Sequence, residues 1–206
     1  DWSPDGKWIA YSHGKGDNFD IWIKPVDGGE PIRVTQHPAP DRIPRWSPDG
    51  KEILFASERS GTWCLWTIDP FDETNEIRQI SADTDSLSRE GQPAAWSPDG
   101  REIVFASERG ENSDLYIVSS DGGTARPFLT RPDSYDWDPD WSPDGEWIAF
   151  NSASDGPSGF ASLWKVARAD TTLVPLDPMK KIAPYSSYNP TWSPDGEKIA
   201  FVSHTG

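Results

Sequence analysis

The 206-residue sequence is short of cysteine, of basic residues and of long apolar segments. A single cysteine, Cys64, excludes an internal disulfide, and its apolar surroundings predict a buried thiol. No apolar stretch approaches the roughly 18 residues that a membrane-spanning helix needs, so we expect no membrane span. Basic residues number 19 against 34 acidic ones, giving a formal net charge of −15. A surface of this sign repels phosphate backbones, so we expect no nucleic-acid partner.

The residue patterns of common catalytic and metal sites are also missing. No Gly-x-Ser-x-Gly elbow is present, and Gly156-Pro157-Ser158-Gly159 has the wrong spacing. The three histidines are scattered, and no glycine-rich phosphate loop occurs. Asp136, Asp138 and Asp140 alternate, but they lack the glycine and the distant glutamate of a calcium loop. We therefore predict a protein that is not an enzyme and has neither a cofactor nor a metal.

Turn formers and aromatic residues are abundant instead. The chain has 12 tryptophans and 20 prolines, well above ordinary usage, together with 17 glycines. Strong helix formers are sparse, and turn formers separate short apolar segments throughout. This composition predicts an all-β protein with many short strands.

One pentapeptide, Trp-Ser-Pro-Asp-Gly, dominates the chain and recurs at intervals of 44, 50, 45 and 51 residues. These intervals are typical of one β-propeller blade per repeat. Two apolar segments and one more polar segment follow each of the first four copies, and a fourth segment leads into the next copy. The pattern predicts four-stranded antiparallel blades. The motif tryptophans are Trp2, Trp46, Trp96, Trp141 and Trp192.

Each part of the pentapeptide suits a tight hairpin turn. Proline presets φ for the first corner, aspartate suits the second, and glycine takes the left-handed conformation. We therefore interpret the motif aspartates as turn formers and the motif tryptophans as blade-packing residues. Runs such as Ile53–Ala56 are apolar at successive positions, which predicts middle strands buried on both faces.

The repeat predicts a single propeller with about four and a half blades in residues 1–206. The expected blades are approximately 1–45, 46–95, 96–140 and 141–191, with an incomplete fifth at 192–206. Four and a half blades do not close a ring, because known propellers have whole blades. We expect either a part of a longer propeller or self-association of two copies that completes the ring.

The residues around the motif resemble a known family. The pattern Pro-x-x-Trp-Ser-Pro-Asp-Gly-x-x-Ile-x-Phe-x-Ser, followed by Leu-Tyr/Trp, Asp-Gly-Gly and Leu-Thr, is similar to the TolB-type propeller repeat, a relative of the WD repeat. Arg42–Ser57 and Gln92–Thr130 match it most fully. The resemblance covers essentially the whole chain. It implies a propeller whose Trp-Ser strands line a central channel, and a periplasmic or extracytoplasmic location.

The same repeat also occurs in propeller domains of prolyl-oligopeptidase-like serine peptidases, so the resemblance leaves function open. Two departures are visible: the second and fourth units replace Asp-Gly-Gly by Asp69-Pro70-Phe71-Asp72 and Arg168-Ala169-Asp170.

Long loops on one face are where we expect a ligand to bind. Tyr135-Asp136-Trp137-Asp138 is the leading candidate, because an aromatic pair beside carboxylates can stack on a ligand and hydrogen-bond to it. The alternative is that Trp137 packs under its own loop while the aspartates cap turns. Further candidates in the loops are Tyr185, Tyr188, His37 and Arg42.

Three functions fit these features of the sequence. The first is a TolB-like scaffold that binds a protein or peptide partner on its loop face or at the channel mouth. The second is a substrate-gating propeller of a prolyl-oligopeptidase-like peptidase. The third is a carbohydrate-binding propeller, suggested by Tyr135, Trp137, Tyr185 and Tyr188.

Overall fold

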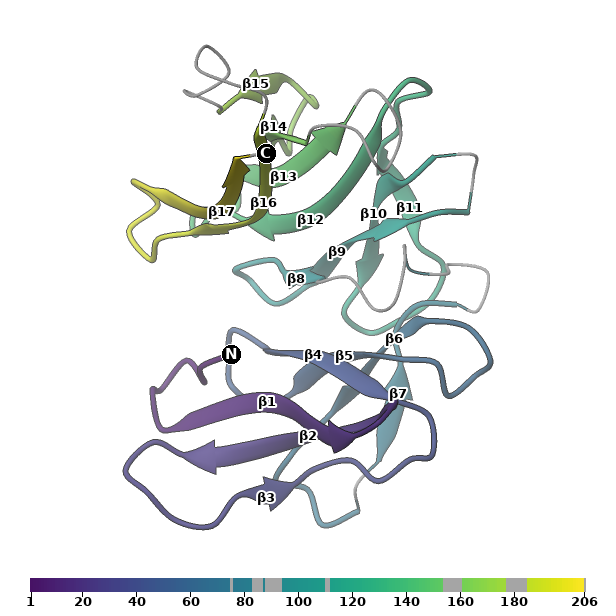
Figure 1. Ribbon diagram of the computed structural model, residues 1–206, viewed down its shortest axis with the longest axis vertical. Helices are drawn as coiled ribbons and strands as arrows, with labels where there is room; N and C mark the ends of the chain where they lie inside the picture. The colour runs from purple at the N-terminus through teal and green to yellow at the C-terminus, as the bar shows by residue number, and fades with distance from the viewer. Residues whose placement is uncertain are drawn as a thin grey trace. The chain divides into compact units, whose positions relative to one another are not determined.

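The computed structural model describes residues 1–74, 76–82, 87, 94–109, 112–153, 161–176 and 185–205, and for 185–187 and 204–205 it describes the backbone alone. Within these residues the regular structure is entirely β, and the strands form antiparallel sheets (Figure 1). The predicted all-β propeller of four-stranded antiparallel blades is confirmed.

The strands follow the chain through five successive sheets, which we number blades 1 to 5. Blade 1 has three strands, and an isolated antiparallel bridge joins Trp2 to Ile9. Blades 2 to 4 have four strands each, and blade 5 has two. Blade 1 contains β1 (Trp8–Lys15), β2 (Asn18–Pro25) and β3 (Ile32–Arg33). Blade 2 contains β4 (Asp41–Trp46), β5 (Ile53–Ser57), β6 (Cys64–Ile68) and β7 (Ile77–Gln79).

The remaining ten strands belong to blades 3 to 5. Blade 3 contains β8 (Ala95–Trp96), β9 (Glu102–Ser107), β10 (Asp114–Ser119) and β11 (Arg126–Leu129). Blade 4 contains β12 (Tyr135–Trp141), β13 (Trp147–Ala153), β14 (Ser162–Ala167) and β15 (Leu173–Pro175). Blade 5 contains β16 (Tyr185–Trp192) and β17 (Ile199–Thr205). The chain folds as two compact units: the first is Asp1–Pro93 with Val118–Ala125, and the second is Ala94–Ile117 with Arg126–Gly206.

All five Ser-Pro-Asp-Gly segments form the same hydrogen-bonded turn. In each, the serine hydroxyl donates to the aspartate carboxylate over 2.5–2.7 Å, and the glycine N–H donates to the serine carbonyl. The five glycines have φ between 70° and 73°, the left-handed conformation that glycine adopts without strain. The turn-forming role of the motif aspartates is therefore confirmed. The end of a blade that carries these turns is called its turn end. The opposite end is called its loop end.

Consecutive turns also contact one another inside each unit. A Cβ added to Gly50 would lie 3.6 Å from Pro4 Cδ of the preceding turn. The same proline–glycine contact joins Pro98 to Gly145, and Pro143 to Gly196. A second repeated link is a hydrogen bond from the backbone N–H of a motif tryptophan to the carboxylate of an aspartate in the preceding blade. Trp46 donates to Asp1 and Trp192 donates to Asp140, each over 2.8 Å.

In blades 2 to 4 the second strands are buried on both faces, as their continuous apolar sequences predict, whereas β1 and β17 are partly exposed. Every residue of β5 is buried, and in β9 and β13 all residues but the first are buried. Phe55, Phe105 and Phe150 occupy the same repeat position and are almost completely inaccessible to solvent. Three of the motif tryptophans are buried as predicted, whereas Trp2 is 58% exposed.

The innermost strands begin before the motif tryptophans, and each of three carries a bulge next to a proline. The register shifts between Arg42 and Arg45, between Trp137 and Asp140, and between Tyr188 and Thr191. The residue before each proline has a positive φ, at Ile43, Asp138 and Asn189. Such an extra residue interrupts the alternation of inward and outward side chains along a strand. The sequence of these strands therefore lacks the alternating pattern and resembles that of a loop. The predicted loop positions of Arg42, Tyr135–Asp138, Tyr185 and Tyr188 are therefore wrong, because these residues lie in β4, β12 and β16.

Replacing Gly50 by valine should lower the free energy of unfolding by about 1–2 kcal/mol, because a β-branched residue is strained in the left-handed conformation. Gly50→Asn should cost less, since asparagine tolerates that conformation. Lys51→Val, at the next exposed position, is the matched control and should change stability by less than about 0.5 kcal/mol. Urea unfolding measures all three. Equal midpoints for Gly50→Val and Lys51→Val would contradict the turn geometry.

The turn aspartates should make stability depend on pH in acid. The hydroxyl of Ser3 and then the N–H of Lys7 donate to the Asp5 carboxylate and lower its pKa to about 2. Because the folded-state pKa lies below the ordinary value, this stabilisation is present above about pH 4 and is lost as the pH falls toward 2. Unfolding free energies measured from pH 6 to 2 should fall less steeply for Asp5→Asn and for Ser3→Ala. Slopes that match the wild type would exclude this contribution.

Candidate binding surfaces

Asp136, the centre of the leading candidate segment, is buried in blade 4. Its carboxylate forms an ion pair with the guanidinium of Arg131, which also donates to the hydroxyl of Ser152 over 2.6 Å. Burial raises the pKa of Asp136 above its ordinary value, and the Arg131 guanidinium opposes that rise. The Asp136 side chain therefore makes its ion pair and hydrogen bonds within blade 4 and the loop that precedes it.

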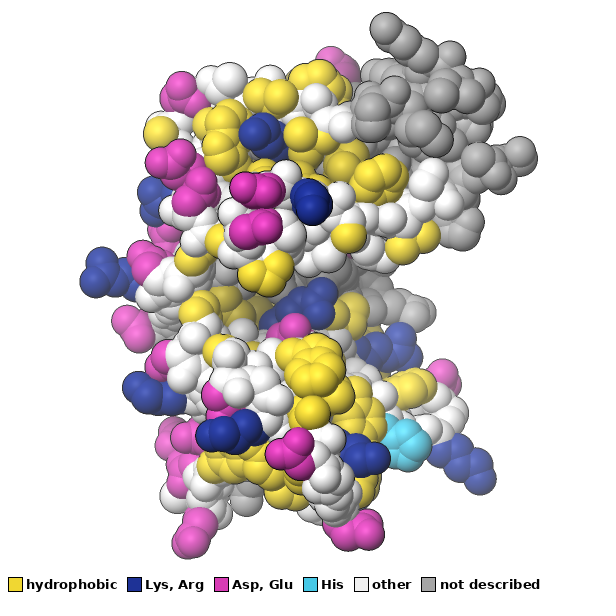
Figure 2. Space-filling view, turned by 90° about the vertical axis from the view of Figure 1, so that its left-hand side faces the viewer, with side chains coloured by type: hydrophobic (Ala, Val, Ile, Leu, Met, Phe, Trp, Pro, Cys, Tyr) yellow, Lys and Arg dark blue, Asp and Glu magenta, His cyan; other side chains and the backbone are white. Residues whose placement is uncertain are grey.

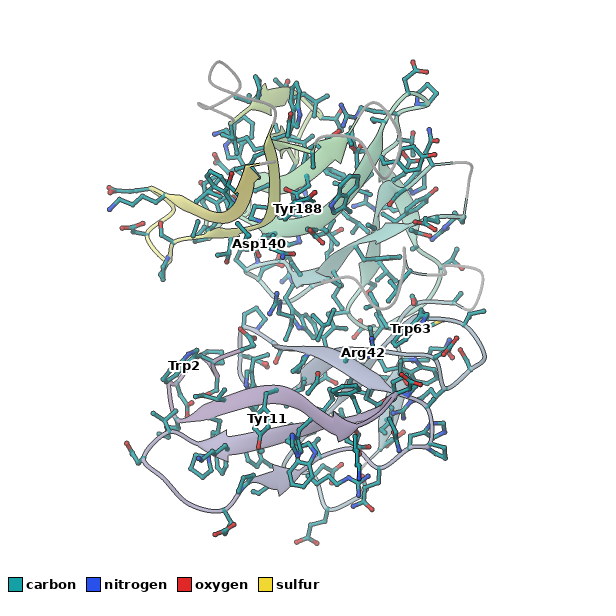
Figure 3. All side chains as sticks on the ribbon, viewed as in Figure 1. Trp2, Tyr11, Arg42, Trp63, Asp140 and Tyr188 are labelled. Atoms are coloured by element: carbon teal, nitrogen blue, oxygen red, sulfur yellow. The ribbon has the colours of Figure 1, made fainter. Side chains whose placement is uncertain are left out.

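The neighbours of Asp136 in β12 also serve blade packing. Asp138 accepts a 2.8 Å hydrogen bond from the Asn151 side-chain amide, and Trp137 is only 9% exposed. Trp137 belongs to the core cluster of the second unit, and Tyr135 and Tyr188 pack against that cluster. Figure 3 labels Tyr188. This burial argues against Trp137 as a platform for sugar stacking. The side chain of Tyr185 lies outside the described residues.

The contacts of Asp136 have a counterpart in blade 2. There Arg59 donates to both oxygens of Asp41 over 2.8 Å, and to Ser57 Oγ over 3.2 Å. Its guanidinium carbon lies 5.1 Å from the Phe55 ring and 5.3 Å from the Trp66 ring. We call this arrangement the Asp–Arg clamp.

Blade 4 builds the same clamp with an arginine from a different loop. Asp136 pairs with Ser152 across β12 and β13, as Asp41 pairs with Ser57 across β4 and β5. The Arg131 guanidinium lies 5.6 Å from the Phe150 ring and 6.0 Å from the Trp164 ring. Arg59 follows the second strand of its blade, whereas Arg131 precedes the first strand. The sequence alone does not reveal either clamp, because the arginine follows its aspartate by 18 residues in blade 2 and precedes it by 5 in blade 4.

The remaining candidates lie at the loop end of the first unit. His37 is half-buried, and its Nδ1 accepts a 3.0 Å hydrogen bond from the Ala39 N–H. Arg42 has its guanidinium carbon 5.1 Å from the Phe19 ring and 5.7 Å from the Trp63 ring. Figure 3 shows Arg42 and Trp63 close together on the side where β1 ends. We call Phe19, Arg42 and Trp63 the loop-end cluster.

The turn end of the second unit holds a pocket of about 290 Å³ between blades 3 and 4. Arg168 crosses it, donating to Glu102 over 2.6 Å with its guanidinium carbon 5.9 Å from the Trp141 ring. Arg126 holds the other oxygen of Glu102 over 2.9 Å. The pocket is lined by Ser97, Pro98, Asp99, Glu102, Trp141, Asp144, Gly145 and Arg168.

In the described part of the chain, no group of three or more His, Cys, Asp or Glu side chains is arranged to hold a metal ion. None of the described segments forms a helix long and apolar enough to cross a membrane.

Comparison with known proteins identifies the family. The family model described as the TolB beta propeller domain matches residues 73–206. The chain belongs to the TolB beta-propeller domain family. The Tol-Pal system protein TolB of Bordetella pertussis (strain Tohama I) is 35% identical to this TolB-family chain over 150 residues, which are 72% of the chain and 32% of that protein.

Two other similarities extend the comparison. A Bacillus subtilis (strain 168) protein named uncharacterized peptidase YuxL is 30% identical over 155 residues, which are 73% of the chain and 21% of that protein. The crystal structure of TolB from Acinetobacter baumannii superposes with a TM-score of 0.74 at 21% identity, covering 96% of the chain and 47% of that structure, which supports the fold alone. The TolB-family chain thus spans about a fifth of YuxL and about a third of the Bordetella TolB.

The Asp–Arg clamp should account for a large share of blade 2 stability. Arg59→Met should lower the free energy of unfolding by about 3 kcal/mol, because it leaves the buried Asp41 carboxylate without its partner. Asp41→Asn combined with Arg59→Met should cost less than the two single changes added together. Arg126→Met, which breaks the more exposed pair with Glu102, is the control and should cost less than about 1 kcal/mol. Additive losses in the double variant would contradict a coupled pair.

Proposed function

We propose that this TolB-family chain is a non-enzymatic scaffold that binds a protein or peptide partner at the loop end of its blades. The supporting observation is the loop-end cluster. Arginine and large aromatic residues are the side chains most enriched at the energetic centres of protein interfaces. Phe19, Arg42 and Trp63 are all half-buried, so part of each side chain is accessible while packing restrains the rest.

The geometry of the cluster suits a partner that presents a carboxylate. The Arg42 guanidinium lies over the Phe19 and Trp63 rings, which hold it by cation–π attraction. Its five N–H donors lie in the plane of the group, where they match a carboxylate in a fork-like geometry. The rings reduce the mobility of the guanidinium, which lowers the entropic cost of binding.

The name of one relative supports a protein partner. The Bordetella relative is named a Tol-Pal system protein. By this kinship we propose a periplasmic or extracytoplasmic location for the chain. The candidate His37 lies in the same unit as the cluster and would act in this proposal as a residue that shapes its loop end.

Site-specific photocrosslinking tests the loop-end proposal. The photoreactive amino acid benzoylphenylalanine is placed at Ser60, an exposed residue of the loop that carries Trp63, and the protein is irradiated in an extract of its source organism. We expect one discrete crosslinked protein. Arg42→Gln should abolish the crosslink without changing the unfolding midpoint, and Arg78→Gln, at the turn end of the same blade, should retain it. The same crosslink from Asp27 at the turn end, or its survival in Arg42→Gln, would contradict the proposal.

The similarity to YuxL favours a second candidate function. A chain related to part of a protein named as a peptidase would serve as a propeller that restricts substrate access to a hydrolase domain. The reading frame that encodes this chain distinguishes the two candidates. A hydrolase domain carrying Gly-x-Ser-x-Gly in that frame would favour the gating role, and a frame without one would favour the scaffold.

A further inference from the structure

At the turn end of the first unit, aromatic side chains meet where blades 1 and 2 adjoin, and we call such a junction of two neighbouring blades a crevice. Phe71 lies in the loop between β6 and β7, where blades 1 and 3 have Asp-Gly-Gly. Its ring is 5.3 Å from that of Trp8 in blade 1, and 6.3 Å from that of Trp46 in blade 2, stacked at 24°. Phe71 is 52% exposed although it touches two tryptophans. The loss of Asp-Gly-Gly therefore creates an exposed aromatic surface.

The equivalent crevices of the second unit each contain a positively charged side chain of the chain itself. Between blades 4 and 5, the Lys165 ammonium lies 4.0 Å from the Trp147 ring and 5.9 Å from the Trp192 ring. Between blades 3 and 4, the Arg168 guanidinium lies over Trp141 and pairs with Glu102. In both crevices a cation of the chain itself stands beside a motif tryptophan.

Blade 1 keeps the aromatic ring but replaces the lysine. Trp8 and Trp147 are each the sixth residue after their motif tryptophan. Lys165 pairs with Ala149 in blade 4, and the residue that pairs with the equivalent Ala10 in blade 1 is Ile23. The crevice of the first unit thus has the ring that receives a cation in blade 4, while the position that supplies the cation is occupied by a buried isoleucine.

The charge around this crevice favours a cation from outside. The four turn-end loops of blades 1 and 2 span residues 3–7, 26–31, 47–51 and 69–74, and hold seven carboxylates and two ammonium groups. Figure 2 looks onto the left-hand side of Figure 1 and shows hydrophobic side chains of the first unit, in its lower part, beside charged ones. The carboxylates are Asp5, Asp27, Glu30, Asp49, Asp69, Asp72 and Glu73.

We propose that the crevice formed by Trp8, Trp46 and Phe71 is a docking site for a protein segment that presents an arginine or lysine beside an apolar residue. The cation lies against the Trp8 and Phe71 rings, and the surrounding carboxylates strengthen its attraction. The apolar neighbour covers the exposed part of Phe71. This site is at the opposite end of the blades from the loop-end cluster, so either proposal can fail without the other.

Two synthetic pentapeptides test the site on the intact chain. The first is acetyl-Gly-Arg-Leu-Arg-Gly-amide, and the second replaces both arginines by citrulline, which keeps the shape and removes the charge. We expect the arginine peptide to shift the NMR signals of the Trp8 and Trp46 indole N–H groups, and to bind at least tenfold more tightly than the citrulline peptide. Equal affinities for the two peptides would overturn the proposal.

Matched variants separate the crevice from general attraction to an acidic protein. Phe71→Ser should weaken binding of the arginine peptide about tenfold, whereas Ile32→Ser, at an exposed apolar residue of the outer strand β3, should leave it unchanged. Both variants keep the net charge. Asp72→Asn tests the contribution of the carboxylates separately, because it leaves the aromatic rings intact. This variant should weaken binding of the arginine peptide several-fold at low salt. Equal effects of Phe71→Ser and Ile32→Ser, or none from either, would show that binding is non-specific and reject the site.

Discussion

The hydrogen-bonded Ser-Pro-Asp-Gly turn is the constraint on which the other features of the blades depend. Its aspartate accepts the serine hydroxyl and a backbone N–H, so a single side chain organises the reversal between the first two strands. Its glycine provides the left-handed corner and lies beside the proline of the preceding turn in the same unit. The same five residues therefore close a hairpin and set the contact between neighbouring blades.

The blades share this turn and differ in the loops that the turn does not constrain. At the loop end, blades 2 and 4 reach the same Asp–Arg clamp with arginines from different loops. At the turn end, Phe71 and Arg168 stand where blades 1 and 3 have Asp-Gly-Gly, and each lies beside the motif tryptophan of its own blade. Repeat proteins generally vary their exposed positions while conserving the packing inside each repeat. In this chain the same crevice becomes aromatic in one unit and ionic in the other.

The segment Tyr135–Asp138 shows why a plausible ligand site can turn out to be core. Aromatic residues beside carboxylates are typical of binding loops, but they also suit an innermost strand that must satisfy its polar groups inside the blade. The pre-proline bulge at Asp138 conceals the strand alternation that would have revealed this. Arg131, which stands five residues before Asp136, compensates the buried carboxylate. Buried charges in proteins are usually paired in this way, so the pairing accounts for Asp136 without a ligand.

The sequence by itself determined the turns, the strand order and the buried middle strands of this TolB-family chain. These features depend on local backbone preferences and on apolar runs, and five repeats of one motif make the local signal unambiguous. Only the tertiary structure decided which arginine meets Asp41 or Asp136, which aromatic residues stay exposed, and where Phe71 and Arg168 lie. Such contacts join loops of different lengths and neighbouring blades. Which side chains meet in these contacts depends on their distance in the folded chain, and the spacing of the residues along the sequence does not predict that distance.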